Sequence, residues 1–109
     1  MARARWAEQL VADWYVRRGW TILARNWTMR GGELDVVAMR DGVVAVCEVK
    51  ARASSAYGDP LEAMTELKVA RVRRAGHEFV RRECPGFVQL RFDMASVLGT
   101  ELTVHVDAF

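Results

Sequence analysis

The chain has few of the residues that bind soft metals or form disulfides, with two cysteines and two histidines among 109 residues. Cys47, Cys84, His77 and His105 are scattered singly and follow no zinc-binding or redox spacing. Cys47 lies in an apolar run, which is typical of a small core residue. The sequence therefore argues against a structural zinc site.

Long apolar runs are absent as well. No stretch approaches the ~18 apolar residues of a membrane-spanning helix, and Glu8 and Asp13 interrupt the segment in which a signal peptide would be apolar. We therefore expect a cytoplasmic protein with no membrane partner. The composition, 51% hydrophobic and 28% charged, is that of an ordinary globular chain. The length predicts one domain spanning residues 1–109.

Lysine is rare. Of the sixteen basic residues only Lys50 and Lys68 are lysines, and the other fourteen are arginines. Arginine is the cation suited to forked contacts with phosphate, although an arginine- and alanine-rich genome explains the same bias. The formal net charge of +2 is by itself no argument for a nucleic-acid partner. The positions of the charges carry more information than their number.

Hydrophobic periodicity and turn signals predict two helices and five strands in the order α-β-β-β-α-β-β. The helices are expected at residues 4–18 and from Thr65 to about Glu83, and the strands at residues 20–25, 32–39, 43–50, 88–97 and 101–107. Asp59-Pro60-Leu61-Glu62 has the cap, the proline and the acidic residue of a further helix start. This order predicts an α/β fold with a mixed central sheet flanked by helices.

Asp41-Gly42 is the strongest short hairpin signal in the chain. With a two-residue loop at this point, Asp35 falls directly opposite Glu48, and Glu33 falls opposite Lys50. Side chains of opposite residues point to the same face, with Cβ atoms about 5 Å apart. The hairpin therefore predicts a patch of carboxylates and one lysine at the end of its two strands.

Apart from these charges, both faces of the hairpin are apolar, so we expect it to be central in the sheet and covered on both sides. The acidic face carries Val37, Met39, Val44 and Val46, and the opposite face carries Leu34, Val36, Ala38, Val43, Ala45, Cys47 and Val49. Opposed carboxylates in a buried strand pair repel each other and are costly to desolvate. Either a divalent metal such as Mg²⁺ held by Asp35 and Glu48 compensates them, or Lys50 neutralises them in a plain ion-pair patch.

The order of Asp35 and then Glu48-Val49-Lys50 on adjacent strands resembles the PD-(D/E)xK restriction-endonuclease-like superfamily. The chain also resembles, over nearly its whole length, the YraN family of small bacterial predicted endonucleases. The blocks that carry this resemblance are Ala7-Glu8, Gly19, Arg25-Asn26, Gly32-Glu33-Leu34-Asp35, Glu48-Val49-Lys50 with Arg52, Gly58, Lys68 with Arg71, and Arg91-Phe92-Asp93. Leu34 stands in place of the proline of the superfamily motif. Thr28 and Ala51 replace an expected arginine and an expected hydroxyl residue.

The resemblance implies a restriction-endonuclease-like core and Mg²⁺- or Mn²⁺-dependent hydrolysis of DNA phosphodiesters. It assigns Asp35 and Glu48 as metal ligands, and Lys50 as the residue that activates the attacking water and stabilises the charge that develops on phosphorus. Glu8 would be a further catalytic carboxylate, acting on water at the metal or as an outer ligand, and a surface pairing role is the alternative. For Glu33, pairing with a neighbouring cation is at least as good an explanation as metal binding.

A basic face runs along the second predicted helix within roughly 140° of arc. It consists of Lys68, Arg71, Arg74, Arg81 and Arg82. Such a face is either solvated surface or a stripe that contacts the phosphate backbone. The residues predicted to contact nucleic acid are Lys68, Arg71, Arg74, Arg30 and Arg52. Trp27, expected in a loop, either stacks on an unpaired base or packs over the first helix.

The domain is too small to carry a separate module that reads sequence. The predicted activity is therefore that of a structure-selective DNA endonuclease acting on branched, flap or single-stranded DNA, and symmetric cutting of a junction would need a homodimer. The alternative is a catalytically weak or inactive nucleic-acid-binding accessory protein in DNA repair, recombination or uptake, with proteins of those processes as partners. Metal-dependent cleavage distinguishes the two hypotheses.

Overall fold

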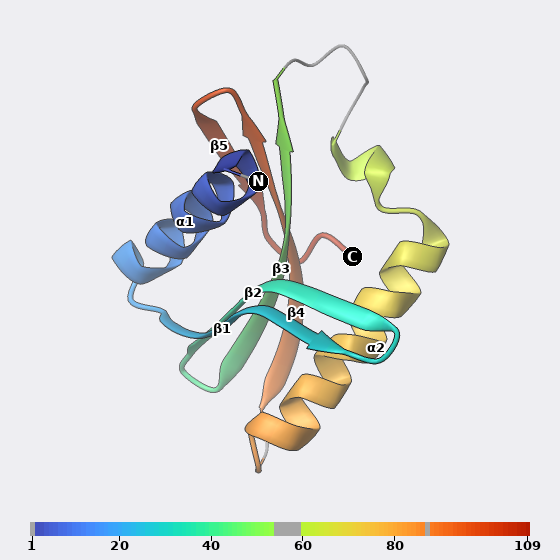
Figure 1. Ribbon diagram of the computed structural model, residues 1–109. Coiled ribbons are helices and arrows are strands. Elements are labelled where there is room, and N and C mark those ends of the chain that lie inside the picture. The colour runs from blue at the N-terminus through green and yellow to red at the C-terminus, as the bar shows by residue number, and fades with distance from the viewer. Residues whose placement is uncertain (1, 54–59, 87) are drawn as a thin grey trace.

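The computed structural model describes residues 2–53, 60–86 and 88–109. A mixed five-stranded sheet in the order β1-β2-β3-β4-β5 lies between two helices, one on each side (Figure 1). The elements are α1 (Ala2–Arg17), β1 (Thr21–Met29), β2 (Gly32–Arg40), β3 (Val43–Arg52), the 3₁₀ helix η1 (Pro60–Ala63), α2 (Glu66–Glu83), β4 (Gln89–Leu98) and β5 (Glu101–His105). The predicted α/β class and the predicted order of helices and strands are confirmed.

The first strand is longer than predicted. β1 pairs with β2 as far as Met29↔Gly32, because a tight turn at Arg30-Gly31 joins them and Gly31 adopts a positive φ of 84°. Trp27, which was expected in a loop, therefore lies within β1.

The sequence predicted two N-terminal helix caps ahead of α2, at Asp59 and at Thr65. Asp59 lies outside the described residues, and Pro60–Ala63 form a single 3₁₀ turn. Thr65 caps α2 as predicted, since its Oγ1 accepts a hydrogen bond from the Lys68 amide at 3.3 Å. Neither helix in the described part of the chain has the length and apolar character that crossing a membrane would require.

The hairpin β2–β3 has the predicted register. Arg40 pairs with Val43 and the antiparallel ladder continues to Val36↔Cys47. Asp41 and Gly42 both adopt positive φ, 49° and 76°, which a two-residue turn of the common hairpin type requires. β3 also pairs with β4 in parallel, because α2 crosses over between these two strands. β3 is therefore the central strand, as expected from its apolar faces.

Two hydrophobic clusters cover the two faces of the sheet. The cluster under α1 contains Val11, Tyr15, Val36, Ala38, Ala45, Cys47 and Ala95. The cluster under α2 contains Leu34, Val37, Val44, Val46, Val72, Ala75, Phe79 and Phe92. The predicted burial of the hairpin on both sides is thus confirmed.

Leu34 was expected on the same face as Val36, and this expectation is wrong. The β2–β3 ladder ends at Val36↔Cys47, and beyond it β2 pairs with β1 alone. The β1–β2 hairpin crosses β3 and reaches α2 (Figure 1), and a register shift between Ile22 and Ala24 accompanies this change of direction. Leu34 consequently packs in the cluster under α2.

Asp93 in β4 is completely buried, and its carboxylate is fully used. Its Oδ2 accepts from the Tyr15 hydroxyl at 2.5 Å, Arg91 donates to both of its oxygens, and the Asp107 amide donates to Oδ1. Burial is the main cause that raises the pKa of Tyr15 far above its usual value, so the hydroxyl keeps its proton and donates. This network ties α1 to β4 and to the C-terminal segment.

Two glycines let α2 lie close to the sheet. A Cβ on Gly76 would lie 2.8 Å from the Phe92 ring, and a Cβ on Gly32 would lie 2.9 Å from the Cβ of Ala75. The first contact brings α2 onto β4, and the second brings the start of β2 onto α2. The missing side chains therefore fix the distance between α2 and the ends of the strands that carry the acidic residues.

Because Gly76 lies so close to the Phe92 ring, we expect Gly76→Ala to destabilise the protein, which is the opposite of its usual effect in a helix. In an ordinary helix interior this change stabilises by about 1 kcal/mol, but here overpacking against the buried Phe92 ring costs about 1–3 kcal/mol. We expect Tm to fall by roughly 5 °C in thermal unfolding. In a Phe92→Leu background, where the ring is gone, the same substitution should no longer lower Tm. A higher Tm in the single variant would contradict the close packing.

Candidate functional site

The site begins where β2 separates from β3. The last pair of the ladder is Val36↔Cys47, one step before the expected pair of Asp35 and Glu48. The Asp35 carboxylate accepts a hydrogen bond from the Val49 amide at 2.9 Å, so a side chain supplies the acceptor where the ladder stops. This bond holds Asp35 against β3 and beside Glu48, as the sequence predicted, although the main-chain pairing ends earlier.

Glu48 is a buried carboxylate whose two oxygens have different surroundings. Its side chain is 12% exposed, and Oε1 lies 3.6 Å from the Lys68 ammonium. Oε2 is buried and has no hydrogen-bond partner among the described residues. Burial, followed by the negative charge of Asp35, raises the pKa of Glu48 from its usual value to about 7, and Lys68 opposes this rise.

Burial is also the main cause that raises the pKa of Asp35. The Val49 amide opposes it, and the negative charges of Glu8 and Glu33 add to it. Both of these adjacent carboxyl groups favour the uncharged form, so a proton or a cation bound between them would stabilise the pair. The predicted acidic cluster is therefore present, and it is electrostatically undercompensated.

Glu8 of α1 lies close enough to raise the pKa of Asp35, and it is only 8% exposed. The Asn26 amide donates to Glu8 Oε1 at 3.0 Å. Asn26 has a positive φ of 51°, a conformation that asparagine tolerates better than most residues. Next to it, Arg25 donates to Gln9 at 2.8 Å. The expected approach of Glu8 to the hairpin is thus found, and β1 holds it there.

Sequence reasoning gave Asn26 no part in the site. In the sequence, Arg25-Asn26 is only one block of the family resemblance. No periodicity signal links β1 to Glu8, because the contact joins residues 18 positions apart through the packing of α1 on β1. The one local hint is that an asparagine within a strand is unusual and often marks a left-handed backbone position.

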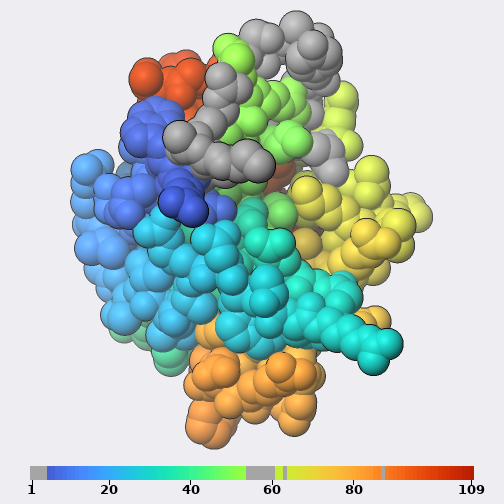
Figure 2. Space-filling model, in the orientation of Figure 1, coloured from blue at the N-terminus to red at the C-terminus, as the bar shows by residue number. Residues whose placement is uncertain are grey.

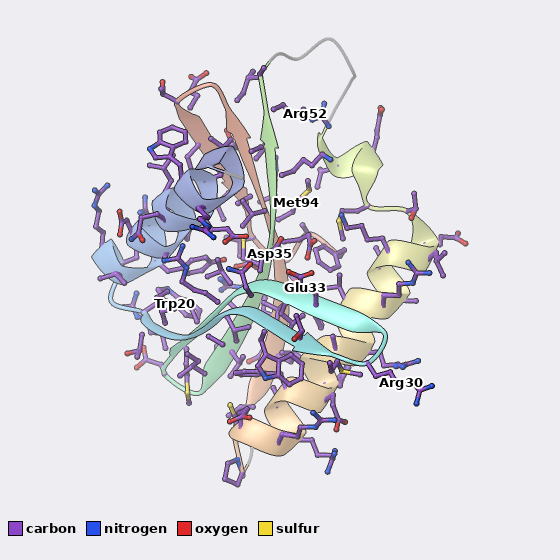
Figure 3. The ribbon with its side chains drawn as sticks, viewed as in Figure 1. Trp20, Arg30, Glu33, Asp35, Arg52 and Met94 are labelled. Atoms are coloured by element: carbon purple, nitrogen blue, oxygen red, sulfur yellow. The ribbon has the colours of Figure 1, made fainter. Side chains whose placement is uncertain are left out.

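Lys50 follows Glu48 by two positions in β3 and is partly buried. Strand alternation puts the two residues on the same face. The expected pairing of Lys50 with Glu33 across the hairpin is not formed in the ladder, because the β2–β3 ladder ends at Val36↔Cys47 and Glu33 pairs only with Thr28 of β1. Glu33 is exposed and lies along β2 from Asp35 (Figure 3).

A groove of about 890 Å³ lies between the β1–β2 hairpin and the first turns of α2. Figure 2 shows a hollow at this place, between the cyan hairpin and the yellow start of α2. The lining residues are Thr28, Met29, Gly31, Gly32, Glu33, Glu48, Thr65, Leu67, Lys68, Arg71 and Val72. The groove therefore joins Glu48 to two of the predicted nucleic-acid-binding residues, Lys68 and Arg71.

The other predicted cations are placed differently. Arg74 is exposed one turn further along α2, and its guanidinium comes close to Gly31 at the hairpin tip. Arg30 occupies the same tip, whereas Arg52 lies toward the opposite end of the molecule, at the end of β3 (Figure 3). None of these three arginines is a lining residue of the groove, but Arg30 and Arg74 lie next to Gly31, which is one.

The far end of the basic helix face is engaged in local pairs. Arg81 and Arg82 both bind Glu78. Trp27 packs edge-to-face on Phe79 of α2 with ring centroids 5.3 Å apart. The expected packing of Trp27 over the first helix is therefore wrong, because its ring packs on α2 instead. Stacking of Trp27 on an unpaired base stays a prediction.

The described residues do not gather three or more His, Cys, Asp or Glu side chains in a geometry that could hold a metal ion. Asp35 and Glu48 are two interacting carboxyls, one short of such a group. They would supply two carboxylate ligands, with Glu8 behind them. The arrangement can hold a cation only if water or a substrate completes the coordination.

Proteins described as UPF0102 proteins are similar to this chain over most of its length. A UPF0102 protein of Leifsonia xyli is 40% identical over 94 residues, which cover 86% of this chain and 80% of the relative. A UPF0102 protein of Acidothermus cellulolyticus is 42% identical over 108 residues, covering 89% of this chain and 81% of the relative. A third UPF0102 protein, from Nocardioides, is 39% identical over 110 residues, which cover 96% of this chain and 88% of the relative.

A solved crystal structure, that of the protein of unknown function AF1548, resembles this fold with a TM-score of 0.51 and 25% identity. The match covers 86% of this chain and 48% of the solved one, so this chain spans about half of that protein. The family model described as "Uncharacterised protein family UPF0102" matches residues 7–97. The expected YraN-like relationship is confirmed, and the chain belongs to the UPF0102 family.

Proposed function

We propose that this protein is a divalent-metal-dependent endonuclease that hydrolyses phosphodiester bonds of DNA. The observation that carries the proposal is the pair Asp35 and Glu48, two mostly buried carboxyls with raised pKa values, of which Glu48 lines a groove together with the cations Lys68 and Arg71. The ion pair with Lys68 involves Oε1 of Glu48 and leaves the buried Oε2 to be satisfied by a proton shared with Asp35 or by a cation. A cation bound by both residues would satisfy it.

The residues fit Mg²⁺ or Mn²⁺. These ions take oxygen ligands and are commonly held by one or two carboxylates, with water and substrate phosphate completing the coordination. The Glu48 Oε2, buried and without a donor among the described residues, is free to serve as a ligand beside Asp35. When bound, such an ion would polarise the scissile phosphate and lower the pKa of a coordinated water.

The side chains around this pair have separate tasks in the proposal. Lys50, on the same face of β3 as Glu48, would place its ammonium beside the attacking water and the phosphorus, where negative charge develops. Glu8, held by Asn26, would accept a proton or orient water from the α1 side. Arg71 and Arg74 would hold the phosphate backbone in the groove.

The groove supports selection of DNA structure rather than of base sequence. Its volume of about 890 Å³ is that of a pocket for one small ligand. A single strand or a splayed nucleotide suits such a space better than an intact duplex. Flap, branched and single-stranded DNA are therefore the proposed substrates.

A second candidate function is that of a nucleic-acid-binding accessory protein without strong cleavage. One observation favours it: among the described residues no three metal-binding side chains come together, and Lys68 already offsets part of the charge of Glu48. In that case the basic groove would bind DNA without hydrolysing it.

Cleavage assays separate the two functions. We expect the wild-type protein to cut a labelled flap, fork, junction or single strand in Mg²⁺ or Mn²⁺ and to be inactive in EDTA. Lys50→Ala should reduce the rate by about 100-fold or more, because it removes a charge that stabilises the transition state, while leaving the circular dichroism spectrum unchanged. Equal cleavage by the variant would exclude Lys50 from the reaction, and salt-sensitive binding without any cleavage would favour the accessory function.

Metal binding should also be visible as stabilisation. At a concentration 100 times Kd, Mg²⁺ or Mn²⁺ should stabilise the fold by about 2.7 kcal/mol, and Tm should rise by several degrees. Asp35→Asn should raise the metal-free Tm, since it removes one of two repelling charges, and should abolish the response to metal. Asp41→Asn, the same change at the exposed β2–β3 turn, is the control and should respond like wild type. An unchanged response in Asp35→Asn would remove Asp35 from the site.

The raised pKa of Glu48 gives a pH dependence with a defined sign. Folding favours the protonated form, so in the absence of metal the stability contributed by Glu48 is present below about pH 4.5 and is lost as pH rises through about 7. Glu48→Gln stays neutral and should gain Tm relative to wild type by roughly 5 °C or more between pH 5 and pH 8. Melting curves of wild type and Glu48→Gln, recorded without metal over this pH range, measure the difference in Tm. If the Tm of the two proteins changes with pH in parallel, Glu48 does not cause the pH dependence.

A further inference from the structure

Lys68 lies where a cation for Glu48 is needed. Its ammonium is 3.6 Å from Glu48 Oε1, which is an ion-pair distance but longer than a hydrogen bond. It does not satisfy the second oxygen, since Oε2 has no partner among the described residues. Lys68 therefore compensates the buried carboxylate only in part, and the contact is loose enough to be exchanged.

The two partners differ in their freedom to move. The Glu48 side chain is 12% exposed and sits on the central strand, whereas the Lys68 side chain is 41% exposed and extends from the first turn of α2. Lysine carries its charge on a flexible four-carbon stem. If the pair separates, Lys68 moves and Glu48 stays. Both residues line the same groove, together with Arg71.

We infer that Lys68 holds the place of the metal in the metal-free protein and turns to a phosphate of the substrate when the metal binds. The inference rests on the proposed function and adds to it a coupling between metal and DNA. A divalent ion at Asp35 and Glu48 displaces the Lys68 ammonium by repulsion. The released ammonium then lies in the groove beside Arg71, where a strand on its way to the carboxylates would pass.

This role distinguishes Lys68 from the other cations of the groove. Arg74 lies beside Gly31 at the edge of the hairpin and has no ion pair to either carboxylate among the salt bridges of the described residues. Its attraction for phosphate is thus the same with and without metal. Lys68 can contribute to DNA binding only after a metal ion has bound Glu48 and broken the ion pair between Glu48 and Lys68. Lys68 is accordingly a positioning residue whose effect depends on the metal.

The first measurement is the affinity for Mn²⁺ alone, by titration calorimetry at about pH 8, where Glu48 is mostly ionised. Lys68→Met keeps the apolar stem but removes the competing charge, so Kd for Mn²⁺ should fall by about tenfold. Lys68→Arg keeps the charge and should bind Mn²⁺ like wild type. Arg74→Met, which removes a charge from the same helix away from Glu48, should change Kd by less than about twofold.

The second measurement is the affinity for a labelled single-stranded oligonucleotide, by fluorescence anisotropy in a Lys50→Ala background that prevents cleavage. Without metal, Lys68→Met should bind the strand as tightly as its parent. With saturating Mg²⁺ it should bind about fivefold more weakly. Arg74→Met should weaken binding by a similar factor in both conditions.

The outcomes separate the inference from the function on which it rests. If the wild-type protein binds no Mn²⁺, the proposed metal-dependent function fails. If it binds Mn²⁺ but Lys68→Met leaves Kd unchanged or raises it, the inference is overturned and the function stands. Equal weakening of DNA binding by Lys68→Met with and without metal would also overturn it, because Lys68 would then be an ordinary phosphate contact.

Discussion

The site depends on one hydrogen bond, from the Val49 amide to the Asp35 carboxylate. At this position the β2–β3 ladder ends, and a side chain takes over the role of the main-chain acceptor. Without that bond, the separation of the two strands would leave a buried N–H without a partner, which is costly in any fold. With it, β2 can turn away toward α2 while Asp35 remains against β3. The charge cluster and the groove are both consequences of this separation.

Asp93 and Glu48, a buried and a mostly buried acid on adjacent strands, have very different surroundings. Asp93 in β4 receives hydrogen bonds from a tyrosine, an arginine and a main-chain amide, and both of its oxygens are occupied. Glu48 in β3 has one distant ammonium and one oxygen without a partner among the described residues. Because burying an unpaired charge is expensive, Asp93 is best understood as part of the framework. Glu48, by contrast, is compensated only in part, and this difference is what the proposed metal site rests on.

The helix α2 packs on the sheet and also contributes residues to the groove. Its close approach to β4 depends on Gly76, and its approach to the β1–β2 hairpin depends on Gly32. These contacts bring the first turns of α2, with Lys68 and Arg71, to the edge of the acidic cluster. A helix that rested on ordinary side chains would stand further from the sheet, and the Lys68 ammonium would not be within ion-pair distance of Glu48. The packing of small residues thus decides the electrostatics of the groove.

Much of the architecture follows from local sequence patterns. Asp41-Gly42 determines the β2–β3 register, the valine-rich strands on both sides of it predict a central position, and the spacing of Asp35, Glu48 and Lys50 predicts a charged cluster at one end of the hairpin. These features depend on turn chemistry and strand alternation, which act over a few residues. The same patterns gave the α/β class and the order of the elements.

Other features were decided only when the chain packed. Alternation put Leu34 beside Val36, but β2 leaves β3 at that point and carries Leu34 into the cluster under α2. The contacts of Lys68 with Glu48, of Asn26 with Glu8 and of Trp27 with Phe79 each join distant elements. They depend on the direction in which the β1–β2 hairpin bends and on how closely α2 approaches the sheet. The sequence by itself determined which groups are present and on which strands they lie. The tertiary structure decided which of them lie together, because strand separation and helix packing act between residues that no local pattern connects.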